Sequence, residues 1–125
     1  MGQKASTPNR QTQATENDTW KEFDFTRIPE WGNEYKNVAS PVYEAKALLE
    51  EAYTIFRSEG MLGKTKYGSL CKRSYSIREK LGILIIRNFP RIRPEDEEVY
   101  RKIKFWGSLL SEPLSELPQM LYRKT

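Results

Sequence analysis

Histidine is absent from this chain of 125 residues, and Cys71 is its only cysteine. The lack of histidine excludes the commonest general base and every catalytic triad built on it. A zinc site within the chain is nearly excluded too, because zinc is held mainly by His and Cys. A single cysteine cannot form an intramolecular disulfide, which favours a reducing, cytosolic compartment. We therefore expect a protein that is no enzyme and holds no metal or cofactor.

Long apolar runs are also missing. The longest, Leu81 to Ile86, contains Gly82 and ends before Arg87, whereas a membrane-spanning helix needs about 20 apolar residues. Hydrophobic residues make up 38% and charged residues 30% of the chain, a composition typical of a soluble globular protein. We expect one compact domain over residues 19–125, preceded by an arm, residues 1–18, that is too polar to order itself.

The start of this arm matches an acylation pattern. Removal of Met1 would expose the α-amine of Gly2, and Ser6 is the small hydroxyl residue that the M-G-x-x-x-[ST] pattern requires. Only glycine serves as the acceptor, because a side chain would obstruct transfer of the acyl group. The pattern predicts myristate on Gly2 and a protein that works at a membrane surface.

An aromatic segment follows the arm, with Pro29 and Gly32 as helix breakers. Its large side chains are Trp20, Phe23, Phe25, Ile28 and Trp31. We predict an irregular segment that packs onto the core through these side chains. The alternative is an aromatic anchor at a membrane interface.

The strongest helix signals begin at Ser40, a good N-cap, with Pro41 at the first helical position and Gly60 as the end. An apolar stripe recurs at spacings of three and four residues: Val42, Ala45, Leu48, Leu49, Ala52, Ile55 and Phe56. This spacing predicts an amphipathic helix. Its acidic residues, among them Glu44 and Glu51, are expected to face solvent.

Positive charge is concentrated between Lys64 and Arg93. This stretch has one acid, Glu79, and nine basic residues, which are Lys64, Lys66, Lys72, Arg73, Arg78, Lys80, Arg87, Arg91 and Arg93. Its net charge is therefore +8, although the whole chain carries only +4. A localised basic surface attracts phosphates, so these nine residues are the candidate site for anionic membrane lipids or for nucleic acid.

Two secondary structures suit this basic stretch. Ser76 and Glu79 have the spacing of a capping box, and the apolar residues from Ile77 to Ile85 include one helical face. The β-branched run next to Gly82 suits a buried strand within residues 64–89 equally well. We favour the helix, and therefore a mainly α fold, a small single-domain helical bundle, with α+β as the alternative.

The rest of the chain also predicts helices. Pro94 opens one, with acids in its first turn and bases in its last, and Gly107 is its expected end. A short closing helix within residues 111–125 is expected from Leu114, Leu117 and Leu121, with Pro113 and Pro118 interrupting it.

The acceptor start, the basic stretch, the small helical domain and the lack of catalytic residues together resemble N-myristoylated viral matrix proteins of the retroviral type. The specific likeness covers Met1 to Thr7. The resemblance implies a myristoyl switch on Gly2 and a basic face that place the domain on the cytoplasmic face of a host membrane. It also implies a homo-oligomer that recruits core and envelope and is carried in the virion.

Two other functions compete with this interpretation. A nucleic-acid-binding protein would use the same basic stretch, with Tyr67, Tyr75 and Phe89 as stacking groups. A viral accessory or adaptor protein would bind host trafficking factors through the acidic face of the helix that follows Ser40. It would also use two motifs of the form tyrosine-x-x-hydrophobic, at residues 35–38 and 67–70.

Overall fold

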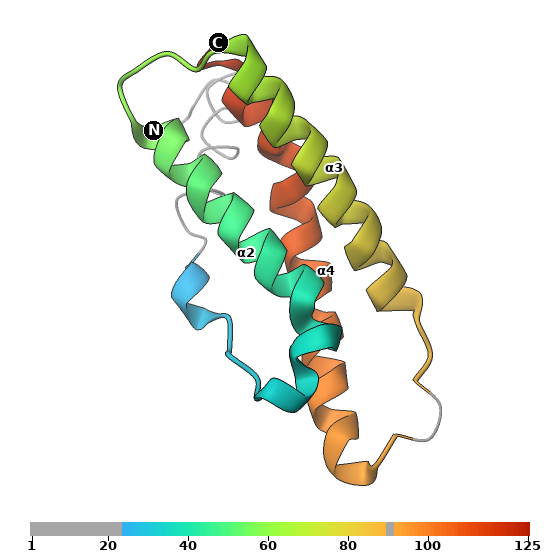
Figure 1. The fold of residues 1–125 in the computed structure, drawn as a ribbon. Helices are drawn as coiled ribbons and strands as arrows, with labels where there is room; N and C mark the ends of the chain where they lie inside the picture. The colour runs from blue at the N-terminus through green and yellow to red at the C-terminus, as the bar shows by residue number, and fades with distance from the viewer. Residues whose placement is uncertain (1–23, 90–91) are drawn as a thin grey trace, which may run out of the picture.

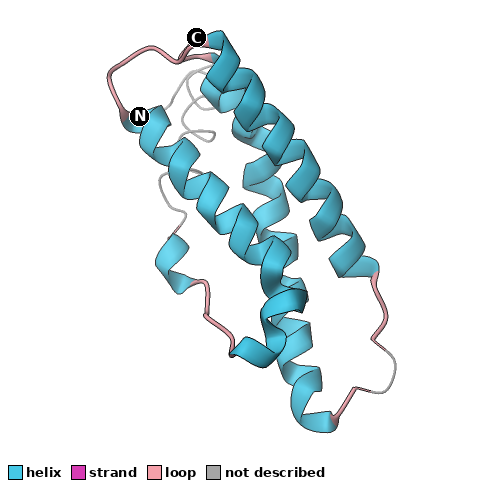
Figure 2. Cartoon of the chain, in the orientation of Figure 1, coloured by secondary structure: helices cyan, strands magenta, loops and turns pink. Residues whose placement is uncertain are grey.

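The computed structural model describes residues 24–89 and 92–125. Two single-turn 3₁₀ helices, η1 (Phe25–Arg27) and η2 (Asn33–Tyr35), precede three long helices, α2 (Lys36–Arg57), α3 (Lys64–Ile86) and α4 (Pro94–Tyr122). The long helices lie side by side in an up-down-up bundle, and each packs against the other two (Figure 1). The described residues contain no strand (Figure 2). The mainly α prediction is confirmed, and the alternative strand within residues 64–89 is not adopted.

One apolar core fills the space between the three helices. Its most buried members are Ala39, Val42, Ala45, Leu48, Leu49 and Ala52 from α2, Leu70 and Leu81 from α3, and Ile103, Leu110, Leu114, Leu117 and Leu121 from α4, all of them 0% exposed. Burial of a Leu or Ile side chain is worth about 1.5–3 kcal/mol. The predicted stripe on α2 is thus confirmed through Ala52, while Ile55 and Phe56 are only partly buried.

The predicted start of α2 is wrong. The helix begins at Lys36, so Pro41 lies inside it and Ser40 is not its N-cap. Pro41 lies in the second turn, where it cannot donate to the carbonyl of residue 37 and its ring crowds that carbonyl, so packing of the helix must offset a local cost. The extra turn buries Ala39 completely. At the other end α2 stops at Arg57, before the expected Gly60.

The capping box predicted at Ser76 is also wrong. Helix α3 begins at Lys64 with Gly63 as its N-cap, which places Ser76 and Glu79 in the middle of the helix. The inward residues Leu70, Ser74, Ile77, Leu81 and Leu84 continue one helical spacing from residue 70 to residue 84. This apolar face, packed on α2 and α4, extends on both sides of Ser76 and favours one continuous helix through it.

Helix α4 does not end at Gly107 as expected but continues through it to Tyr122. A Cβ atom at Gly107 would lie 3.4 Å from Leu81 Cδ2 and 3.6 Å from Leu84 Cδ2. Gly107 therefore faces α3, and a methyl group at this position would reach van der Waals contact with Leu81 and Leu84.

A hydrogen bond between helices compensates for Pro118, which lies inside α4. Because proline has no N–H, the carbonyl of Leu114 lacks its usual donor four residues later. The hydroxyl of Ser74 on α3 donates to that carbonyl at 2.8 Å, and Ser74 is only 1% exposed. This buried hydroxyl of α3 thus supplies the bond that allows α4 to continue.

The segment before α2 packs onto the bundle, as predicted for its apolar residues. Ile28 is 4% exposed, and Phe25 and Trp31 are partly buried against the core. The backbone N–H of Trp31 donates to Tyr43 Oη at 2.8 Å, which ties the segment to α2. Trp20 and Phe23 lie outside the described residues.

The bond from Ser74 to α4 predicts non-additive stability. Ser74→Ala should lower the free energy of unfolding by about 1–3 kcal/mol, because it leaves a buried carbonyl without a donor. In a Pro118→Ala background the cost should be smaller by about 1 kcal/mol or more, because the backbone N–H restored at position 118 can then donate to the Leu114 carbonyl.

A double-mutant cycle in urea measures this coupling. The control is Ser115→Ala. The Ser115 hydroxyl donates to the backbone carbonyl of Glu112 on the exposed side of α4, and its loss should show no coupling to Pro118. Equal losses from Ser74→Ala in both backgrounds would contradict the proposed compensation.

Candidate functional site

Helix α3 carries six of the nine predicted basic residues, and its packing decides where each one points. Because Leu70, Ile77 and Leu81 face the core, the basic residues lie either on the flank towards α2 or on the solvent side. All six are exposed: Lys64, Lys66, Lys72, Arg73, Arg78 and Lys80. The structure therefore divides the predicted site into two groups.

The first group, Lys66, Arg73 and Lys80, recurs every seven residues along the flank that faces α2. Lys66 Nζ lies 2.8 Å and Arg73 Nη1 lies 3.0 Å from the carboxylate of Glu51. Lys80 Nζ lies 3.0 Å from Glu44. The hydrogen bond from Lys66, with a further one from Arg73, lowers the pKa of Glu51. Acids of α2 thus partly neutralise this flank, which sequence analysis had assigned to an unbalanced basic surface.

These ion pairs leave the basic side chains accessible. Lys66, Arg73 and Lys80 keep 51%, 45% and 49% of their side-chain surface exposed. Exposed pairs of this kind contribute only about 0–1 kcal/mol each. The flank therefore joins α2 to α3 weakly, and its charge is partly satisfied within the molecule.

The second group lies on what we call the outer face of α3, made of Lys64, Lys72, Tyr75, Arg78, Glu79, Ile83 and Ile86. Within the described part of the chain, Lys64, Lys72 and Arg78 form no ion pair. Three large apolar side chains accompany them, with Tyr75 and Ile83 each 63% exposed and Ile86 79% exposed. An open groove of about 330 Å³ lies beside them, lined by Tyr75, Arg78, Glu79 and Ser111 of α4.

The apolar members of this face were not predicted from the sequence. Ile83 and Ile86 belong to the run that the strand alternative would bury, and the favoured helix assigned them to no face, yet both point to solvent. The signal was available in the spacing of Leu70, Ser74, Ile77, Leu81 and Leu84, which leaves residues 83 and 86 on the opposite side. Apolar and cationic side chains therefore share one accessible helix face.

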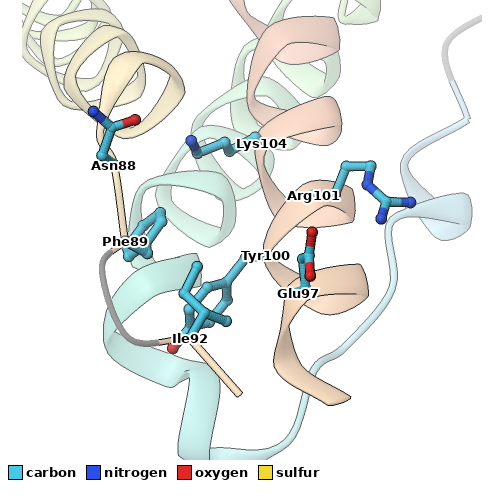
Figure 3. Close-up of a pocket in the computed structure, with 7 residues that line it drawn as sticks. All are labelled: Asn88, Phe89, Ile92, Glu97, Tyr100, Arg101 and Lys104. Carbon is cyan, nitrogen blue, oxygen red and sulfur yellow. The ribbon is translucent and has the colours of Figure 1, made fainter. Parts of the chain in front are cut away.

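A second basic cluster lies where α3 ends and α4 begins. The guanidinium carbon of Arg87 lies 4.8 Å, and Lys104 Nζ lies 5.2 Å, from the centre of the Phe89 ring. The same ring packs on Tyr100 at 4.6 Å between centroids. An open pocket of about 490 Å³ adjoins this cluster, and its lining comprises Asn88, Phe89, Ile92, Glu97, Tyr100, Arg101 and Lys104 (Figure 3). Among the predicted site residues that the structure describes, Arg87 alone belongs to this cluster.

Arg93 has a structural role at the start of α4. Its Nε lies 2.7 Å from Asp96 Oδ2, and Tyr35 Oη donates to Asp96 Oδ1 at 2.5 Å. Weaker contacts reach Glu95 at 3.7 Å and Glu34 at 3.8 Å. The network joins η2 to α4, so the charge of Arg93 is largely satisfied within the fold. Gly2 and Arg91, the remaining predicted site residues, lie outside the described residues.

Most of the tyrosine and phenylalanine side chains predicted for the competing functions form hydrogen bonds or ring contacts within the fold. Tyr67 Oη donates to the carbonyl of Pro118 at 2.9 Å, and Leu70 of the same motif is 0% exposed. Tyr35 is bonded to Asp96, and Phe89 is partly covered by Arg87 and Lys104. Of the three predicted stacking groups, Tyr75 alone is exposed. The described residues thus contain neither an assembled stacking platform nor an extended tyrosine motif.

Other binding chemistry has little support in residues 24–89 and 92–125. No three carboxylate or thiol side chains there gather closely enough to hold a metal ion. None of the helices described is long and apolar enough to cross a membrane. Comparison of the chain with protein-family models, curated proteins and solved structures found no match. The outer face of α3 is therefore chosen as the candidate site from the exposure and charge of its own side chains.

The network of Tyr35, Arg93 and Asp96 predicts how stability depends on pH. The hydrogen bonds from Arg93 and Tyr35 lower the pKa of Asp96, so its contribution should be complete above about pH 4 and lost as pH falls through the lowered pKa. The same bond raises the pKa of Tyr35 to about 12. The contribution of Tyr35 should therefore be lost as pH rises above about 10.

Urea unfolding of the wild type, Asp96→Asn and Tyr35→Phe between pH 2 and 12 measures how the free energy of unfolding changes with pH. Asp96→Asn should reduce its fall at acid pH, and Tyr35→Phe should reduce its fall at alkaline pH. Tyr75→Phe on the exposed side of α3 is the control for general tyrosine ionisation. Parallel profiles for all four proteins would show that the network does not couple to folding.

Proposed function

We propose that this protein is a peripheral membrane-binding, matrix-type structural protein of virus assembly, anchored by myristate on Gly2 and by the outer face of α3. The observation that carries the proposal is the mixture of exposed side chains on that face. Lys72 and Arg78 lie beside Tyr75, Ile83 and Ile86, which are 63%, 63% and 79% exposed. Such a face suits an anionic bilayer, where cations contact headgroup phosphates and apolar side chains enter the interface.

The energies favour two anchors acting together. One myristoyl chain gives a membrane association constant of only about 10⁴ M⁻¹, which is reversible. A basic side chain near an anionic leaflet adds about 1 kcal/mol. Lys64, Lys72 and Arg78 would then supply about 3 kcal/mol, or a factor of roughly 100 in affinity. Their long apolar stems can lie along the interface while the charges reach the phosphates.

The two groups of basic residues on α3 should contribute unequally. Lys66, Arg73 and Lys80 lie 2.8–3.0 Å from acids of α2, so a lipid phosphate must compete with Glu44 and Glu51. Lys64, Lys72 and Arg78 form no ion pair among the described residues, although one acid, Glu79, lies on the same face. The outer face should therefore supply most of the electrostatic attraction.

The acylation half of the proposal is tested with Gly2→Ala. This variant should not incorporate a myristate analogue in cells, and it should move from the floating membrane fraction to the soluble fraction. Its circular dichroism and thermal melting should equal those of the wild type. A variant that floats as well as the wild type would refute the anchor on Gly2.

The basic half is tested by two matched triple variants of α3. Changing Lys64, Lys72 and Arg78 to Gln should weaken binding to acidic liposomes about 100-fold at low salt and hardly change binding to neutral ones. The control variant changes Lys66, Arg73 and Lys80 to Gln. It removes the same residue types and the same charge, and it should lose several-fold less.

Salt should reproduce the loss of liposome binding through screening. Because nucleic-acid binding shows a similar salt dependence, competition between acidic liposomes and RNA or DNA separates the two. Equal losses from both triple variants would assign the attraction to total charge and not to the outer face. Tight nucleic-acid binding at physiological salt without a preference for acidic liposomes would replace the membrane proposal.

A further inference from the structure

The solvent-facing side of α4 has an apolar centre that the proposed membrane contact does not use. Phe105 and Leu109 are one helical turn apart and are 58% and 42% exposed. Basic residues, Arg101 and Lys102, lie one turn before Phe105. Acidic Glu112 lies one turn after Leu109. We call these five residues, with Glu98 and Glu116, the outer face of α4.

The charges on this face change sign across its apolar centre. In an antiparallel pair of α4 helices, residues whose numbers have the same sum lie opposite each other. The register that places Phe105 against Leu109 of a second copy also places Lys102 in the turn that faces Glu112 of that copy. Both contacts occur twice, as in an isologous two-fold interface.

From this complementarity we infer that the outer face of α4 is the interface of an antiparallel homodimer. A parallel pair would bring Lys102 against Lys102 and Glu112 against Glu112, which costs free energy. Neither Lys102 nor Glu112 has an ion-pair partner within the described residues. A second copy of the chain thus supplies both missing charges and covers both apolar side chains.

One contact in this register brings like charges together, since Glu98 faces Glu116 of the second copy. Arg101 lies in the adjacent turn, with its Nη1 3.2 Å from Glu98. This ion pair lowers the repulsion between the two carboxylates, because a cation lies next to one of them. The register thus pairs apolar with apolar at its centre and Lys102 with Glu112 on either side, with Glu98 against Glu116 as its like-charge contact.

The dimer and the membrane contact use different helices. The outer face of α4 shares no residue with the outer face of α3. The inference therefore goes beyond the proposed function and can fail without it. Its test uses the unacylated full-length chain in the absence of lipid, where a failure of dimerisation says nothing about α3.

Charge reversal tests the inferred register by sedimentation equilibrium. Lys102→Glu and Glu112→Lys should each raise the dimer dissociation constant at least tenfold, and the double variant should restore it. An equimolar mixture of the two single variants should also form heterodimers, because one partner then carries only acids and the other only bases at these positions. Glu50→Lys on the exposed side of α2 makes the same charge change as Glu112→Lys and should leave the mass unchanged.

Phe105→Ser tests the apolar centre and should likewise give monomer, while thermal melting at low concentration stays close to that of the wild type. A wild-type chain that stays monomeric at about 100 μM would overturn the inference. A dimer that tolerates both single charge reversals would overturn it equally, because another surface would then hold the copies together.

Discussion

The close contact between α3 and α4 is the constraint on which the rest of the domain depends. Gly107 of α4 faces Leu81 of α3 across this contact, and a Cβ atom there would lie 3.4 Å from the Leu81 side chain, at van der Waals distance. Ser74 then comes within 2.8 Å of the carbonyl that Pro118 leaves without a donor. Helix α4, 29 residues long, therefore passes Pro118 with that carbonyl hydrogen-bonded, and its buried side chains extend from Ile103 to Leu121.

This contact also fixes the orientation of α3 about its own axis. With Leu70, Ser74 and Leu81 turned inward, Lys66 and its heptad neighbours face the acids of α2 and Lys72 faces solvent. A stretch that carries +8 in sequence thus becomes a paired flank and an unpaired outer face. The proposed membrane contact depends on that division more than on the number of basic residues.

The two helix faces we assign differ in their physical character. The outer face of α3 is cationic with apolar side chains, which matches the headgroup region of an anionic bilayer. The outer face of α4 carries both signs in an order that its own antiparallel copy complements. The two faces lie on different helices and have no residue in common. Membrane attachment and self-association would then proceed without competing for side chains.

Local sequence determined several features of this protein. Spacings of three and four residues predict the buried stripe of α2 from Val42 to Ala52, and the same periodicity favours a helix over a strand before Arg87. The acids after Pro94 correctly predict the start of α4, because charge at a helix terminus acts locally. The order of residues also places most of the excess positive charge between Lys64 and Arg93.

Tertiary packing decided what local signals could not. Pro41, Gly107 and Pro118 are read from sequence as helix boundaries, because an isolated helix would lose stability at each of them. In the fold α2 continues through Pro41 to bury Ala39, and α3 supplies the compensation in α4. The partners of Lys66, Arg73 and Lys80 come from 15 or more residues away along the chain, and no local pattern indicates them. The packing of three helices around one core decides which charges stay unpaired and which apolar side chains stay exposed.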